Sequence, residues 1–329
     1  MHILVTGGGG FLGEAIIKGL LKKNYTVRSI GRKEAKHLRP YGVDILCGDL
    51  SDPQTAKDAI RGVDAVIHTA AKAGIWGAKE DFYKSNVLAT ENLLREAQKA
   101  HVQYFIYTST PSVVIGKDDI HHGDERLLHA SPFLCHYAAT KALAETTVLK
   151  AASPHFRTLA LRPHLIWGEK DPHLVPTLLA KARQGRLIQV GKGHNRVDLT
   201  HVDNAAWAHI LALEALQLGK GIGKAYFVSD DDPVALWDWI AKLLEALSLP
   251  PVSKTLSFRQ AYSLGYVLEK LYAPFQASPP LTRFLAIQLG KSHFFNIQAI
   301  KEDLGYQPIQ DPSQALKNYI ASLQDILRK

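Results

Sequence analysis

Short apolar runs alternate with longer amphipathic stretches over the first half of the chain. The apolar runs lie at residues 3–5, 26–30, 44–46, 65–68, 104–108 and 158–161. Most of the stretches between them carry apolar residues three and four positions apart, the spacing of a helix, beginning with residues 11–21. This rhythm predicts βαβ units. Because crossovers between parallel strands are right-handed, we expect an α/β fold with a doubly wound parallel sheet and a ligand at the carboxyl ends of its strands.

The pattern changes after residue 168, where prolines and glycines interrupt the chain more often. One further strand is predicted at 225–228, and helices are predicted at 204–218, 236–247, 258–271, 279–289 and 313–327. We therefore expect residues 1–168 to form a dinucleotide-binding domain to which residues 203–229 return. Residues 169–202 and 230–329 would form a smaller, mainly helical C-terminal substrate lobe. The many apolar and aromatic residues of 262–275 would serve helix packing or a pocket for an apolar substrate.

Composition narrows the class of protein without choosing a function. The 329 residues are 46% hydrophobic, which is enough for a large core. Lysine and arginine outnumber acidic residues by 39 to 31, giving +8, and the charges are scattered. A phosphorylated coenzyme and an acidic substrate would suit this balance, and so would an ordinary solvated surface. The sequence contains no dense basic run of the kind that would indicate a nucleic-acid partner, so none is expected.

The sequence also indicates where the protein is located and whether it binds a metal. No apolar stretch reaches the roughly 18 residues of a membrane span, and the first strand begins at the second residue, so we expect a cytoplasmic protein without a signal peptide. Peripheral contact of an apolar helix with a membrane stays open. Cys47 and Cys135 form no disulfide framework, and His121 and His122 have no partner at a ligand spacing, so no metal is predicted.

Glycines fill the junction between the first predicted strand and the first predicted helix. Gly7 would permit a tight turn, Gly10 would let phosphates approach the backbone, and Gly13 would let helix and strand pack closely. Free N–H groups and the helix dipole would then face a dinucleotide pyrophosphate. A glycine-rich turn alone is weak support, because flexible loops also use glycine. In its strand–turn–helix context it predicts a Rossmann-type site.

The end of the second strand bears on the choice of coenzyme. An acidic residue there would bind the adenosine ribose of NAD(H), but the position is Gly31, followed by Arg32 and Lys33. Two cations at this place favour the 2′-phosphate of NADP(H), with NAD(H) as the alternative. Asp49 and Leu50, after the third strand, are placed to flank the adenine, although an aspartate there also suits a simple turn.

Tyr137 and Lys141 lie four positions apart in a strongly helix-forming stretch, so their side chains share one face. The ordinary tyrosine pKa of about 10 is too high for easy proton exchange, and a nearby ammonium together with a nicotinamide charge would lower it. Tyr137 could then act as a general acid or base. Thr110, with Ser109 and Ser112 as alternatives, would hold a substrate carbonyl. The pair Tyr266–Lys270 has the same spacing but no hydroxyl cluster, so we interpret it as helix surface.

These motifs occur in the order found in a known family. Thr6-Gly-x-x-Gly-x-x-Gly13, Asp49-Leu50, His68-Thr-Ala-Ala71, the Asn86 string, the 108–112 cluster, Tyr137-x-x-x-Lys141 and Arg162-Pro163 together resemble the extended short-chain dehydrogenase/reductases. Residues 70–77, 161–168 and 200–204 are similar to the 3β-hydroxysteroid dehydrogenase-type branch, especially to its bacterial 2-alkyl-3-oxoalkanoate reductases. The resemblance covers nearly the whole chain.

The resemblance implies a role for each matching residue. Tyr137 would be the acid/base, Lys141 would hold the nicotinamide ribose, Asn86 would order the proton path, and Thr110 would replace the usual serine with a more restricted hydroxyl. The expected coenzyme contacts are Gly7, Gly10, Phe11, Leu12, Gly13, Arg32, Lys33, Asp49, Leu50, Thr69, Ala70, Ala71, Lys141, Pro163 and Ile166. The expected substrate contacts are Lys72, Trp76, Ser112, His164, Trp167 and His173. The tryptophans and histidines among them are candidates because they follow strands that point toward the site, although each alone would also suit the core or the surface.

Three classes of function fit these residues. The leading hypothesis is an NADP(H)-dependent oxidoreductase that interconverts a β-keto and a β-hydroxy group on a hydrophobic substrate, either a 2-alkyl-3-oxoacid or a 3-hydroxysteroid-like compound. A nucleotide-sugar epimerase or dehydratase is the first alternative, and a non-catalytic dinucleotide sensor is the second. The resemblance also implies a homodimer formed through a helix pair that includes residues 137–150.

Overall fold

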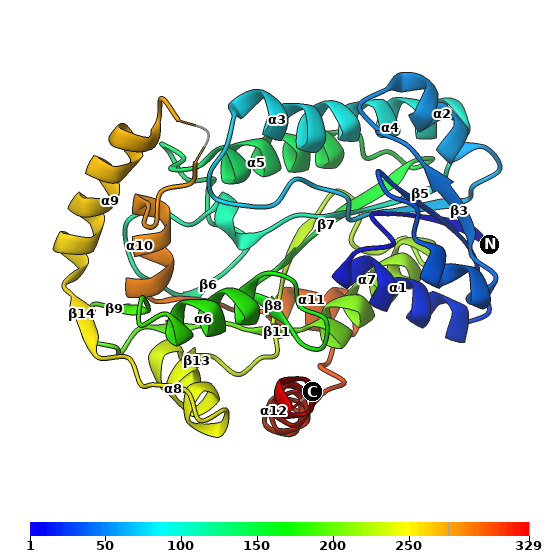
Figure 1. The fold of residues 1–329 in the computed structure, drawn as a ribbon. Coiled ribbons are helices and arrows are strands. Elements are labelled where there is room, and N and C mark those ends of the chain that lie inside the picture. The colour runs from blue at the N-terminus through cyan, green and yellow to red at the C-terminus, as the bar shows by residue number, and fades with distance from the viewer. Residues whose placement is uncertain (276, 329) are drawn as a thin grey trace.

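The computed structural model describes residues 1–275 and 277–328. Its centre is a seven-stranded sheet in which each pair of neighbouring strands is parallel (Figure 1). In spatial order the strands are β12 (Ala225–Val228), β7 (Arg157–Pro163), β5 (Tyr104–Thr108), β4 (Ala65–His68), β1 (His2–Thr6), β2 (Thr26–Gly31) and β3 (Asp44–Cys47). Each contains one of the predicted runs, so the doubly wound α/β fold is confirmed.

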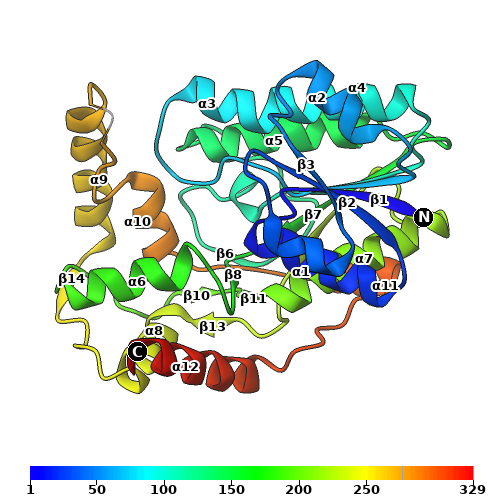
Figure 2. The same cartoon turned by 45° about the vertical axis from the view of Figure 1, so that its right-hand side comes forward.

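Helices cover both faces of this sheet (Figures 1 and 2). One layer holds α2 (Pro53–Ile60), α4 (Ala89–Lys99) and α5 (His136–Lys150), with α3 (Lys79–Tyr83) at its end. The other holds α1 (Phe11–Lys22), α7 (Val202–Gln217) and α11 (Gln298–Leu304). The sheet is apolar on both faces because each face is buried, which explains its near-continuous hydrophobic strands.

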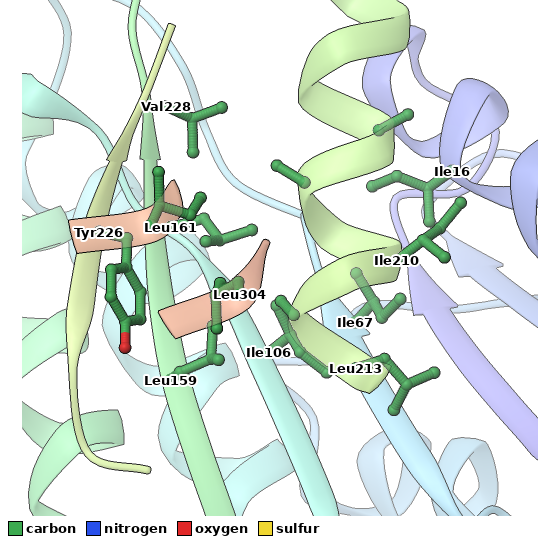
Figure 3. Close-up of a cluster of buried hydrophobic side chains, with 14 of the residues drawn as sticks. Ile16, Ile67, Ile106, Leu159, Leu161, Ile210, Leu213, Tyr226, Val228 and Leu304 are labelled. Atoms are coloured by element: carbon green, nitrogen blue, oxygen red, sulfur yellow. The ribbon is translucent and has the colours of Figure 1, made fainter. Parts of the chain in front are cut away.

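The larger part of the core lies under α1 and α7. Figure 3 shows Ile210 of α7 beside Ile16 of α1, with Ile67 and Ile106 of the sheet close by, all of them buried. Gly19 of α1 faces Ile210, and a Cβ at this glycine would come within 2.4 Å of the Ile210 Cδ1. The close approach of α1 and α7 fixes the helix that starts at the glycine-rich turn.

A second group of elements lies beyond the carboxyl edge of the sheet. Its helices are α6 (Leu174–Arg183), α8 (Leu236–Ala246), α9 (Phe258–Tyr272), α10 (Arg283–Gly290) and α12 (Pro312–Arg328). A small sheet has the order β13 (Val234–Ala235), β10 (Arg196–Val197), β15 (His293–Phe295) and β6 (Ile120–Gly123), and two-stranded pairs join β8 (Ile166–Trp167) to β11 (Thr200–His201) and β9 (Ile188–Val190) to β14 (Lys254–Leu256).

The helices and strands of this second group were predicted less accurately from the sequence than those of the central sheet. The short strands were not predicted, because two to four residues are too few to show alternation, and α6 and α11 were not predicted either. Helix α10 begins at Arg283 instead of residue 279, because the Thr282 hydroxyl accepts from the Leu285 N–H at 3.0 Å and caps the helix there. Among the described residues, no helix is both long enough and apolar enough to cross a membrane.

Candidate active site

The glycine-rich turn closes tightly against the sheet. The Gly7 N–H donates to the Ile30 carbonyl at 2.7 Å, and Gly7 has φ of +68°, a left-handed conformation that favours glycine. A Cβ on Gly13 would lie 2.3 Å from the Gly7 carbonyl oxygen, so only glycine fits there. Gly10 caps α1 without a side-chain hydrogen bond. The first N–H groups of α1 are therefore free of a side-chain cap, as an anion site requires.

A cleft of about 560 Å³ opens beside this turn at the carboxyl edge of the sheet. Twelve of the fifteen predicted coenzyme contacts line it: Gly7, Gly10, Phe11, Leu12, Gly13, Arg32, Lys33, Asp49, Leu50, Thr69, Ala70 and Ala71. Lys141, Pro163 and Ile166 are not among the lining residues. The cleft also takes in residues that the sequence analysis did not name, including Gly9, Glu34, Ala35, His37 and Ser85. The positions of Glu34, Ala35 and His37 depend on how the loop after β2 folds back, and that of Ser85 depends on the π turn after α3, neither of which a local motif shows.

Two exposed cations stand at one end of the cleft. Arg32 and Lys33 follow β2 directly, and the neighbouring carboxylate of Glu34 pairs with Lys36 at 3.9 Å and with Arg39. Asp49 also lines the cleft. Burial raises the pKa of Asp49, but hydrogen bonds from Ser51 and the nearby Lys84 ammonium outweigh burial and leave it lowered. The cleft therefore offers the two cations and the Asp49 carboxylate to a nucleotide.

Tyr137 lies in the first turn of α5, beside the hydroxyl groups that follow β5. The Thr110 hydroxyl lies beside the Tyr137 hydroxyl and donates to the Ser112 hydroxyl at 3.1 Å, so these three residues form one polar group. Burial raises the pKa of Tyr137 to about 12, and the contact with Thr110 only partly offsets this. The lowering expected from the sequence thus does not come from the charges of this chain alone. A neutral phenol suits proton donation.

Lys141, one helical turn after Tyr137, is almost completely buried. Its ammonium donates to the Thr108 carbonyl at 2.5 Å and lies 4.1 Å from the centroid of the Tyr107 ring. Burial lowers the pKa of Lys141 to about 7, while the Glu145 carboxylate acts weakly in the opposite direction. The side chain is therefore held at the end of β5, where it is close to losing its proton at neutral pH.

Asn86 lies in a π-helical turn, Lys84–Leu88, that joins α3 to α4. Its side-chain oxygen accepts from the Lys72 N–H at 2.7 Å, and its amide donates to the Lys72 carbonyl and the Thr140 hydroxyl, both at 3.1 Å. A π turn re-aims side chains and is frequent at functional sites. Asn86 thus fastens the loop after β4 to the helix that carries Tyr137. Its part in a proton path stays a prediction.

A buried ion pair, which the sequence analysis did not identify, anchors the other end of this helix. Arg162 of β7 binds both oxygens of Glu145 of α5, at 2.9 and 2.6 Å, and His129 approaches the same carboxylate at 2.9 Å. Burial raises the pKa of Glu145, but Arg162 and His129 lower it to about 2. The Arg162-Pro163 motif was the available signal, but its partner could not be inferred without the fold.

The surroundings of Tyr137 are mostly apolar. Three separate segments contribute to this cluster, which consists of Ile75, Phe133, Leu134, Cys135, Ala138 and Phe284 around Tyr137. Phe284 comes from α10, so the C-terminal helices reach the candidate reacting group. The site combines one hydroxyl network with an apolar wall.

The predicted substrate residues are not all brought together. Ser112 is buried beside Thr110, and Trp76 is partly buried in the loop after β4. The Lys72 ammonium pairs with Asp81 at 2.6 Å, and His173 lies exposed at the start of α6. Trp167 packs in a buried cluster with Trp239 and Tyr319. Their contacts with a substrate stay predictions.

His164, another predicted substrate contact, is tied to a residue far along the chain. The His164 Nε2 lies 2.7 Å from the Nδ1 of His293 in β15, and the His293 Nε2 lies 3.1 Å from the Gln288 carbonyl. Because the carbonyl only accepts, His293 donates to it and His164 donates to His293. Burial holds the pKa of His164 well below its usual range. Both rings are therefore neutral and join the sheet to the C-terminal elements.

Comparison with known proteins places this architecture. The model of the 3-beta hydroxysteroid dehydrogenase/isomerase family matches residues 4–258. The chain is 42% identical to the 2-alkyl-3-oxoalkanoate reductase of Stenotrophomonas maltophilia (strain K279a), over 98% of this chain and 99% of that protein. It is 33% identical to the decarboxylating sterol-4-alpha-carboxylate 3-dehydrogenase of Mus musculus, over 98% of this chain and 91% of that protein.

A solved structure shows the same fold at lower identity. The UDP-glucuronic acid 4-epimerase of Bacillus cereus, in complex with NAD, superposes with a TM-score of 0.74 at 22% identity, over 98% of this chain and 100% of that chain. At this identity the likeness concerns the fold alone. The family match and the two curated relatives go further: the chain belongs to the 3-beta hydroxysteroid dehydrogenase/isomerase family of the extended short-chain dehydrogenase/reductases, and it is an oxidoreductase acting on a keto or hydroxy group.

Proposed function

We propose that the protein is an NADP(H)-dependent reductase that interconverts a β-keto and a β-hydroxy group on a 2-alkyl-3-oxoacid or a similar hydrophobic compound. The observation that carries this proposal is the setting of Tyr137, which combines a polar contact with Thr110 and an apolar wall that includes Phe284. A polar sugar nucleotide would leave its hydroxyls unpaired against such a wall. The reductase relative of 42% identity supports the same substrate class.

The coenzyme cleft supports a nicotinamide dinucleotide. Gly7 and Gly13 hold the turn tightly against the start of α1, Gly10 places no side chain over the first N–H groups of that helix, and the fold neighbour from Bacillus cereus was solved with NAD. Arg32 and Lys33 favour a coenzyme with a 2′-phosphate, because charge-assisted contacts to phosphate are strong. A bound nicotinamide would give hydride to the substrate carbon or accept it in the reverse direction.

Side chains of the protein would then transfer the proton and position the substrate. The Tyr137 hydroxyl, neutral in the protein alone, would donate its proton to the carbonyl oxygen, and the Thr110 hydroxyl would hold that oxygen in place. The Lys141 ammonium, now bonded to the Thr108 carbonyl, would favour the phenolate left after proton transfer. Asn86 would keep the loop after β4 fixed against α5 while this occurs.

The proposal is tested with purified protein and a panel of substrates. NADPH consumption would be followed with a 2-alkyl-3-oxoacid, while 3-hydroxysteroids are tested with NADP⁺ and UDP-sugars are tested for isomeric products. We expect turnover of the 3-oxoacid. Turnover of a UDP-sugar alone would support an epimerase, and coenzyme binding without turnover of any substrate would support a sensor. The expected homodimer through α5 stays a prediction that sedimentation would check.

A further inference from the structure

Helix α9 carries an apolar stripe that the described part of the chain leaves uncovered. Five of the twelve large apolar side chains that are exposed in the described part of the chain lie between residues 264 and 275. Leu264, Val267 and Leu271 are 42%, 50% and 59% exposed, and their spacing of three and four residues places them on one face of the helix. Phe275, 67% exposed, follows just past the end of α9. Scattered exposed leucines are common, but a continuous stripe is not.

The opposite face of α9 already has its partner. Gly265 packs so closely on α10 that a Cβ there would lie 2.7 Å from the Arg283 nitrogen. Glu269 accepts from the Arg283 N–H and from its Nε, both at 2.7 Å. Figures 1 and 2 both show α9 at the edge of the molecule, outside α10. The stripe therefore serves neither the packing of α9 nor a pocket between the two helices, the two roles expected for this segment.

The charges on α9 indicate what the stripe faces. Arg259, Ser263, Tyr266 and Lys270 form a second exposed row next to it, again at spacings of three and four. The only carboxylate within residues 258–272 is Glu269, which is buried against Arg283. An exposed face made of leucine, valine, tyrosine and cations, without an acidic side chain, is typical of a helix that lies on an anionic lipid surface.

We propose that α9 is a docking surface for an anionic lipid bilayer, with Leu264, Val267, Leu271 and Phe275 inserted among the acyl chains. Arg259 and Lys270 would reach the headgroups with their apolar stems along the surface. A second copy of the chain is the weaker candidate, because a stable protein interface uses about 20 to 30 residues on each side. The stripe has four, and like-charged rows would meet across it.

The position of α9 suggests a function for its contact with the bilayer. Helix α10, on which α9 packs, contributes Phe284 to the apolar cluster around Tyr137. A water-insoluble substrate could pass from the bilayer to that cluster along α9 and α10 without crossing bulk water. This second step rests on the proposed function, whereas the docking of α9 does not.

The test is flotation of the full chain with vesicles, in the absence of coenzyme and substrate. We expect binding to vesicles of phosphatidylcholine mixed with phosphatidylglycerol, and weaker binding to phosphatidylcholine alone. The double variant Leu264→Gln/Leu271→Gln should bind at least about tenfold more weakly, since two buried side chains are lost from the bilayer. The charge variant Arg259→Gln/Lys270→Gln should lose only the preference for phosphatidylglycerol.

A matched control distinguishes binding through α9 from nonspecific hydrophobic adsorption to the vesicles. Leu128 and Leu218 are also exposed leucines and lie outside α9, so Leu128→Gln/Leu218→Gln should bind like the unaltered protein. Circular dichroism and NADPH binding would show that each variant is folded. Equal vesicle binding by the Leu264→Gln/Leu271→Gln variant overturns the proposal, and so does a lipid-free dimer that this variant dissociates. Reductase activity on a short soluble 3-oxoacid is a separate measurement, so failure of the proposed function would not be mistaken for failure of docking.

Discussion

Arg162 and Glu145 form a two-pronged ion pair inside the protein, with Nε and Nη2 on one carboxylate at 2.9 and 2.6 Å. The pair connects β7, at the carboxyl edge of the sheet, to α5, two turns after Tyr137. Removing one partner of a buried pair leaves an uncompensated charge, which costs about 3 to 5 kcal/mol. We therefore expect Arg162→Ala to lower the free energy of unfolding by this amount, measured by urea denaturation at pH 7.

The exposed pair of Arg126 and Asp124 provides the matched control, because Arg126→Ala should change stability by about 1 kcal/mol or less. The sign with pH follows from the lowered pKa. Glu145 has a pKa of about 2 when folded, against an ordinary value of 4.5, so its stabilising effect is complete above pH 4.5 and disappears as the pH falls to about 2. An unchanged difference between the unaltered protein and Arg162→Ala over this pH range would contradict the assignment.

Replacement of the candidate acid should separate chemistry from binding. Tyr137→Phe removes the proton but keeps the ring in its apolar cluster, so NADPH should bind normally while kcat falls by about 10² to 10⁴. Tyr266→Phe is the control, since Tyr266 and Lys270 have the same four-residue spacing on the outer helix α9. Stopped-flow turnover and a fluorescence titration would give the two quantities. Full activity of Tyr137→Phe would remove this tyrosine from the mechanism.

We expect the buried Lys141 side chain to lower the free energy of unfolding near neutral pH. Its folded pKa of about 7 lies below the ordinary value of 10.5, so between these values the unfolded chain binds more protons and stability rises with pH. Lys141→Met lacks this titration. We expect the variant to unfold at higher urea concentration than the unaltered protein at pH 7, with the difference shrinking toward pH 10. A constant difference would show that Lys141 does not titrate in this range.

The preference for NADPH should depend on two exposed cations. Arg32→Ala and Lys33→Ala should each weaken NADPH binding about tenfold or more and leave NADH binding nearly unchanged, because charge-assisted contacts to phosphate contribute about 1.5 to 3 kcal/mol. Lys36→Ala is the control, as Lys36 already pairs with Glu34. Equal dissociation constants for the two coenzymes in the unaltered protein would refute the preference itself.

Local signals explain why the sheet and the coenzyme cleft could be predicted from the sequence. A strand, Gly7, Gly10, Gly13 and a helix lie within the first 22 residues, so their meaning does not depend on distant parts of the chain. The cleft follows because the carboxyl ends of parallel strands share one edge. Tyr137 and Thr110 meet at the same edge, because Thr110 follows the end of β5 and Tyr137 lies at the start of α5, the helix that precedes the parallel strand β7.

The remaining features depend on contacts between distant segments. His164 hydrogen-bonds His293, which lies 129 residues later. No sequence motif near either histidine indicates this pairing. The π turn that aims Asn86 has no known sequence pattern, and the pKa of Tyr137 reflects burial that only the assembled fold creates. The exposed face of α9 could not be predicted from the sequence, because it depends on which side of the helix packs on α10, and this is set by the close contact of Gly265 with α10.

The outermost strand, β12, reaches its neighbour late in synthesis. Residues 225–228 pair with Ala160 to Pro163 of β7, more than sixty positions earlier. Until the ribosome has released that segment, one side of β7 presents unsatisfied backbone N–H and C=O groups, the kind of open border on which chains aggregate. Translation beyond residue 228 thus gives β7 its second neighbour, and a chain truncated before it would keep β7 as an exposed edge strand.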